Sequence, residues 1–154
     1  MFPIPWYVVL LVSIPEAFLI ILIGFALFNL KIDIRTALII SIFEAIAVYT
    51  VRLFPVIFGL HTLTGFLVML ILTNLLTKTS FRNTFMTILT GLVSMGAITA
   101  LWTPAFLLFT SSNVQDLAQN PILNVICFIP IAFIGLVFYW LVKKYRLILF
   151  DLNR

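Results

Sequence analysis

The sequence is poor in the residues from which most catalytic and metal sites are built. Among its 154 residues it has one cysteine, one histidine and five acidic residues. A single cysteine, Cys127, can form no disulfide within the chain, and one cysteine with one histidine cannot supply the four ligands of a structural zinc site. There is also no glycine-rich phosphate loop or nucleotide motif. We therefore expect no enzymatic activity, no metal and no cofactor, and we expect Cys127 to be a small packing residue.

Charge is equally scarce. Charged residues make up 9% of the chain and hydrophobic residues 64%, whereas a soluble domain is about a quarter charged and half apolar. The apolar residues come in runs of about twenty, the length that crosses a hydrocarbon core of ~30 Å. The alternating segments of about ten residues that are typical of a membrane β-barrel do not occur. The sequence therefore predicts one all-α, polytopic transmembrane helix bundle over residues 1–154, in contact with the lipid bilayer.

Five spans can be placed along the chain. No Lys or Arg precedes the first span and no cleavage site follows it, so we expect it to be retained. Pro55 ends the second span because proline lacks an N–H donor and disfavours helix in the preceding residue. Pro104 is expected to bend or shorten the fourth span, and Asn120-Pro121 to start the fifth. The expected spans are 5–28, 36–54, 56–76, 83–109 and 121–142.

Lysine and arginine set the orientation of these spans. Eight of the nine fall in the first and third connections and in the tail after the last span, and Arg52 is alone on the opposite side. By the positive-inside rule, this bias places those segments in the cytoplasm, and five spans then place the N-terminus outside. We expect a multi-pass protein of the cell (cytoplasmic) membrane with basic loops beside anionic lipid, and no nucleic-acid partner. The eight are Lys31, Arg35, Lys78, Arg82, Lys143, Lys144, Arg146 and Arg154.

Four ionisable residues fall inside or at the edge of the expected spans, where a charge costs at least ~2.5–3.5 kcal/mol to insert near the bilayer centre. Glu16 and Glu44 fall near mid-depth. Arg52 falls at the outer boundary of the second span, and His61 about a turn and a half inside the third. They form either a ligand site open to the outside or a structural network with glutamates hydrogen-bonded between helices. In both cases we expect Arg52 to find a partner in Glu16, Glu44 or backbone carbonyls.

Four short motifs carry a resemblance to a known family. They are the stretch beginning Ser13-Ile-Pro-Glu-Ala, then Val51-Arg52-Leu53-Phe54-Pro55, Phe58-Gly59-Leu60-His61-Thr62 and Gln119-Asn120-Pro121-Ile-Leu-Asn. The chain resembles the membrane-embedded sensor region of Firmicute histidine kinases of the accessory-gene-regulator and sporulation-associated types. The resemblance implies that the spans detect an extracellular or membrane-borne cue. Such kinases continue into a phosphoacceptor helix and an ATP-binding domain, whereas this sequence ends at Arg154, so we expect no autophosphorylation by this polypeptide.

Three functions stay open at this point. The first is a sensor or regulatory module that detects a peptide or small-molecule ligand and passes the signal to a partner membrane protein, a cytoplasmic partner or a second copy. The second is a small subunit of a membrane transporter or other membrane complex, with its site between broken helices. The third is a structural membrane scaffold that oligomerises through its apolar faces. The helix breaks that the second function needs are expected at Pro15, Pro55, Pro104 and Pro130.

Overall fold

The computed structural model describes residues 5–54 and 60–152, and every regular element within them is helical. The first three elements form one continuous helical span over Trp6–Leu27. A polar loop and a short helix separate the last two spans. The elements are α1 (Trp6–Val8), the π-helical turn η1 (Val9–Ser13), α2 (Ile14–Leu27), α3 (Ile34–Arg52), α4 (Leu60–Thr77), α5 (Phe81–Thr110), α6 (Val114–Gln119) and α7 (Pro121–Tyr145).

The prediction of an all-α chain with five helices long and apolar enough to cross a membrane is confirmed. The expected start of the third span, at residue 56, lies outside the described residues. The fifth span runs on to Tyr145, three residues past its expected end. Asn120 caps it as expected, because its side-chain oxygen accepts hydrogen bonds from the backbone N–H groups of Ile122 and Leu123 at 3.2 and 3.3 Å.

The prolines break the helices less than the sequence suggested. α5 continues through Pro104 to Thr110, and α7 continues through Pro130, so neither position divides its span. The expectations of a shortened fourth span and of helix breaks at these two prolines are therefore wrong, whereas a bend at Pro104 stays a prediction and Pro55 lies outside the described residues. Pro15 does coincide with an irregularity, since the π-helical turn η1 ends two residues before it. A widened turn there accommodates the ring and the missing N–H of Pro15 without ending the span.

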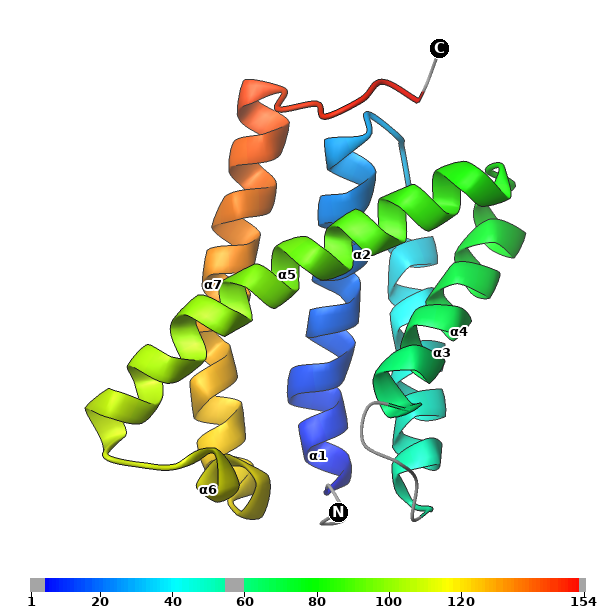
Figure 1. Ribbon diagram of the computed structural model, residues 1–154. Helices are drawn as coiled ribbons and strands as arrows, with labels where there is room; N and C mark the ends of the chain where they lie inside the picture. Colours follow the sequence, from blue (N-terminus) through cyan, green and yellow to red (C-terminus); the bar gives the residue numbers. More distant parts are fainter. Residues whose placement is uncertain (1–4, 55–59, 153–154) are drawn as a thin grey trace.

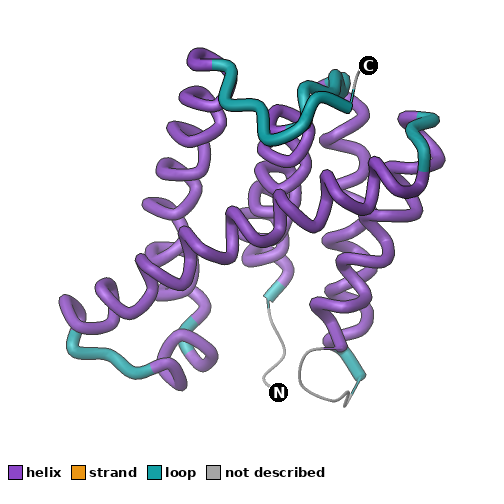
Figure 2. Tube along the Cα trace, turned by 45° about the horizontal axis from the view of Figure 1, so that its top comes forward, coloured by secondary structure: helices purple, strands orange, loops and turns teal. Residues whose placement is uncertain are grey.

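α2 is the central helix of the bundle. Nine of its 14 residues are buried, and it packs against α3, α5 and α7. Figure 1 shows α5 crossing α2 obliquely, from the end of α4 to α6, and the turned view in Figure 2 shows the same crossing. The length of α5 explains this tilt, because 30 residues extend about 45 Å and exceed the thickness of a hydrocarbon core.

Two glycines let the backbones of α2 and α5 touch where they cross. A Cβ atom at Gly24 of α2 would meet the carbonyl of Thr87, and one at Gly91 of α5 would meet the carbonyl of Ile20. Side chains at either position would push the helices apart. This is the close approach that small residues permit between membrane helices.

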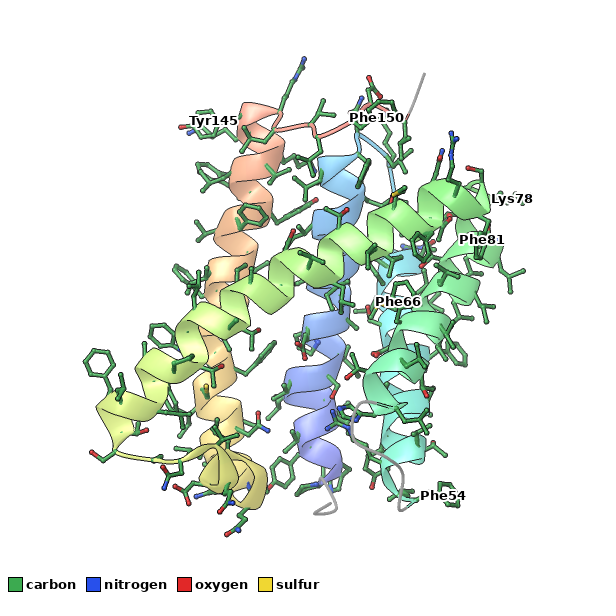
Figure 3. All side chains as sticks on the ribbon, viewed as in Figure 1. Phe54, Phe66, Lys78, Phe81, Tyr145 and Phe150 are labelled. Carbon is green, nitrogen blue, oxygen red and sulfur yellow. The ribbon has the colours of Figure 1, made fainter. Side chains whose placement is uncertain are left out.

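The bundle has two distinct ends. Figure 3 shows Lys78 and Tyr145 at one end and Phe54 at the other. The first end, which we call the basic end, holds the α2–α3 and α4–α5 loops and the end of α7, and with them seven Lys and Arg residues. The other end, which we call the Arg52 end, holds the start of α1, the end of α3 and the start of α4.

The segment after α7 folds back across the basic end. Arg146 adopts a left-handed conformation (φ 49°) that terminates α7. The Leu149 N–H then donates to the Leu27 carbonyl at 2.9 Å, and the Leu152 N–H donates to the Phe28 carbonyl at 3.3 Å. These bonds satisfy carbonyls at the C-terminal end of α2 that have no helical partner. Residues 147–152, which we call the strap, lie over the end of α2 in Figure 1.

Candidate functional site

One cavity brings together the four ionisable residues singled out in the sequence. It has a volume of about 180 Å³ and lies between α2, α3 and α4, with one wall residue from α5. Its polar wall consists of Ser13, Glu16, Glu44, Arg52, His61 and Thr62. Its apolar wall consists of Ala17, Ile20, Val48, Phe66, Met69 and Leu92. We call it the polar cavity.

The four ionisable residues lie at two distances from the Arg52 end of the bundle. Arg52 is the last residue of α3 and His61 the second of α4, so both lie at the Arg52 end. Glu44 precedes Arg52 by eight residues, or about 12 Å along α3. Glu16 lies ten residues after the start of the first span, or about 15 Å. Glu44 and Glu16 therefore lie about half the thickness of a hydrocarbon core, ~15 Å, from the Arg52 end.

Glu44 is held against α4 by a glycine. Its side chain is only 8% exposed, and its carboxylate oxygen Oε1 occupies the space that a Cβ atom at Gly65 would take. Val48, one turn further along α3, lies 3.0 Å from the same position. Because Gly65 has no side chain, α3 and α4 pack closely while Glu44 stays at the cavity wall.

Arg52 and the two glutamates interact electrostatically across the polar cavity. The expectation that Arg52 pairs with Glu16, Glu44 or a backbone carbonyl stays a prediction. Among the described residues, the buried Arg52 Nε has no hydrogen-bond partner. Arg52 is half-buried and forms part of the cavity wall.

His61 and Thr62 stand at the start of α4, beside Arg52. His61 is half-buried and Thr62 is exposed. Both His61 and Arg52 line the polar cavity. The polar cavity therefore reaches the surface at Thr62, beside His61, and Glu16 and Glu44 lie further from this end of the bundle.

The donor set favours an organic ligand over a metal ion. Within residues 5–54 and 60–152, no three His, Cys, Asp or Glu side chains gather closely enough to hold a metal. The arrangement can instead bind a small molecule that offers both a positive group and a hydrogen-bond acceptor.

No protein-family model, curated protein or solved structure matches the chain. The resemblance to kinase sensor regions thus rests on the sequence motifs alone. Of the polar residues in those motifs, Ser13, Glu16, Arg52, His61 and Thr62 line the polar cavity.

Sequence reasoning missed three features near the site and at the bundle ends. Gly65 was not singled out, although a glycine inside an apolar helix often marks a close approach. The helix α6 lies in the connection between the fourth and fifth expected spans, where no helix was expected. The pair Asn113 and Asp116 could have indicated it, since the Asn113 N–H donates to the Asp116 carboxylate at 2.6 Å. The strap has no local pattern that could have predicted its docking on α2.

Proposed function

We propose that the protein is a membrane-embedded sensor or regulatory module that binds a small extracellular ligand in the polar cavity. One observation carries this proposal: four ionisable side chains from α2, α3 and α4 line a single cavity. A group of ionisable residues inside a membrane bundle is costly, and such residues commonly mark a ligand or ion site.

The charge distribution supports an outward-facing cavity. Seven Lys and Arg residues lie at the basic end in the described residues, whereas Arg52 lies at the opposite end. The positive-inside rule assigns the basic end to the cytoplasm and the N-terminus to the outside. The polar cavity, which reaches the surface beside Arg52, then opens to the outside.

The strap offers a way to transmit a change in the polar cavity to the basic end of the bundle. α2 carries Glu16 near one end and hydrogen-bonds to the strap through Leu27 and Phe28 at the other. A ligand that shifts α2 relative to α3 and α4 also shifts the carbonyls to which the strap is bound. Since the strap lies at the basic end, a cytoplasmic or membrane partner can detect its release or repositioning.

A single-cysteine experiment tests this function. In a Cys127→Ala background, Ser13→Cys places a thiol on the cavity wall, and a membrane-impermeant trimethylammonium-ethyl methanethiosulfonate reagent occupies the cavity by covalent attachment. We expect labelling from outside the cell and altered hydrogen exchange at the Leu149 and Leu152 amides. The matched control, Ser112→Cys, lies outside the cavity and should leave that exchange unchanged when labelled.

The outcomes separate the three functions. Labelled Ser13→Cys with unchanged exchange in the strap would contradict a sensor. Uptake of a solute into vesicles that stops when the same cysteine is labelled would support a transporter subunit. Labelling that alters only the oligomeric state would support a scaffold.

A further inference from the structure

The polar cavity holds one more negative than positive charge when its acids are ionised. Glu16 and Glu44 contribute two negative charges and Arg52 contributes one positive charge, which leaves a net charge of minus one. An uncompensated charge in a low-dielectric site is costly, so it is relieved either by protonation of one acid or by an occupant that carries one positive charge, and such an occupant favours the ionised form.

The cavity wall contains one hydrogen-bond acceptor and one donor that make no hydrogen bond within the described residues. The Glu44 carboxylate is more than nine-tenths buried, and the described part of the chain supplies it with no hydrogen bond, only the charges of Glu16 and Arg52. Within residues 5–54 and 60–152, the buried Arg52 Nε is a donor without an acceptor. A complementary occupant therefore offers a charged donor to the carboxylates and an acceptor to Arg52.

The remaining wall is apolar and the volume is small. Ile20, Phe66 and Met69 line the cavity beside the charges. About 180 Å³ is well above the ~30 Å³ of one water molecule and below the ~300–1,000 Å³ of pockets that enclose drug-sized ligands. The space suits a few carbon atoms next to one polar group.

We infer that the polar cavity binds a primary ammonium ion that has a small apolar side chain and a neighbouring carbonyl oxygen. The ammonium group lies between Glu16 and Glu44, the carbonyl oxygen accepts from Arg52, and the side chain packs on the apolar wall. This inference rests on the proposed function and names its ligand class. A free amino-acid derivative and the N-terminal residue of a peptide share this chemistry.

A matched set of probes tests each group in turn. L-leucinamide has the ammonium, the carbonyl and the side chain, 4-methylpentanamide lacks the ammonium, and 3-methylbutylamine lacks the carbonyl. We expect leucinamide to raise the thermal unfolding midpoint of the purified protein and 4-methylpentanamide to leave it unchanged. Leucylglycinamide, which extends the chain beyond the carbonyl, should bind more tightly than leucinamide if the natural source is a peptide, and more weakly if it is a free amino-acid derivative.

Three variants connect the probes to the residues. Glu44→Gln keeps the shape of the side chain and should weaken leucinamide binding about 10- to 100-fold, the effect of losing one charge-assisted hydrogen bond. Arg52→Gln changes the net charge for both cations, so the carbonyl contact is measured by the ratio, and the variant should weaken leucinamide about tenfold relative to 3-methylbutylamine. Asp33→Asn, at an exposed acid of the basic end that makes no capping hydrogen bond, is the charge-matched control and should change neither.

If Glu44→Gln fails to fold, Gly65→Ala tests the role of the Glu44 carboxylate in its place. Its new Cβ would displace the Glu44 carboxylate, and leucinamide binding should fall while Gly96→Ala, with nothing within 4 Å of the added atom, has no effect. Equal binding of 4-methylpentanamide and leucinamide, or full binding by folded Glu44→Gln, would overturn the inference. If no probe binds but labelling of Ser13→Cys still alters the strap, the ligand class is wrong and the sensor function stands.

Discussion

Glu44 is the one charged side chain that is buried in the described part of the chain. It stays in contact with the polar cavity because Gly65 gives its carboxylate room against α4. Arg52, two turns along the same helix, and Glu16, on the neighbouring helix, both act on it electrostatically. Two carboxylates and one guanidinium in low dielectric depend on one another, so a change at any of them alters the other two.

The Gln and Ala variants of Glu44 should differ in stability. Glu44→Gln keeps the shape and removes a buried charge, and we expect a free energy of unfolding within about 1 kcal/mol of the parent. Glu44→Ala leaves a void beside Gly65 and removes a counter-charge from Arg52, and it should lose about 1–3 kcal/mol. Denaturant unfolding in detergent micelles measures both. Equal stability of the Ala form and the parent would show that Glu44 is not part of a packed polar site.

At the scale of elements, the crossing of α2 and α5 organises the bundle. Gly24 and Gly91 lie one turn from Ile20 and Thr87, respectively, and each glycine faces a carbonyl of the other helix. The long, tilted α5 can therefore lie directly on the central helix. α2 is thereby held from one side by α5 and from the other by α3, which carries Glu44 and Arg52.

Alanine substitutions in α5 should separate close packing from helix propensity. Gly91→Ala places a methyl group against the Ile20 carbonyl, which backbone atoms cannot avoid, and should cost about 1–3 kcal/mol. Gly96→Ala, on the same helix, meets nothing within 4 Å and should be neutral or stabilise by up to about 1 kcal/mol through helix propensity. Thermal unfolding followed by circular dichroism compares them. If both variants have the same midpoint, the helices do not touch at this crossing.

The elements differ in how far the sequence predicts them. Long apolar runs predicted the five spans because run length and hydrophobicity are local properties. The continuation of α5 through Pro104 depends on the tolerance of membrane helices for proline, which a local rule understates. The strap joins Leu149 to Leu27, and no local pattern predicts a contact between segments so far apart in the chain.

On the scale of the whole molecule, charge divides the bundle into two unlike ends. The basic end carries the lysines and arginines of the loops, and the Arg52 end carries the opening of the polar cavity. The sequence singled out all four ionisable residues of the site because burial of charge in a span is costly wherever it occurs. It could not predict the apolar wall, because Phe66 and Met69 are ordinary residues of an apolar helix and only their neighbours make them part of the site.

The central claim, that the polar cavity faces the outside of the cell, is tested most directly by thiol labelling in intact cells. On a Cys127→Ala background, Ser112→Cys places a thiol between α5 and α6 at the Arg52 end, and Lys78→Cys places one at the basic end. We predict that a membrane-impermeant maleimide labels Ser112→Cys in intact cells and labels Lys78→Cys only after permeabilisation. Labelling of Lys78→Cys in intact cells, with Ser112→Cys protected until permeabilisation, would contradict the account.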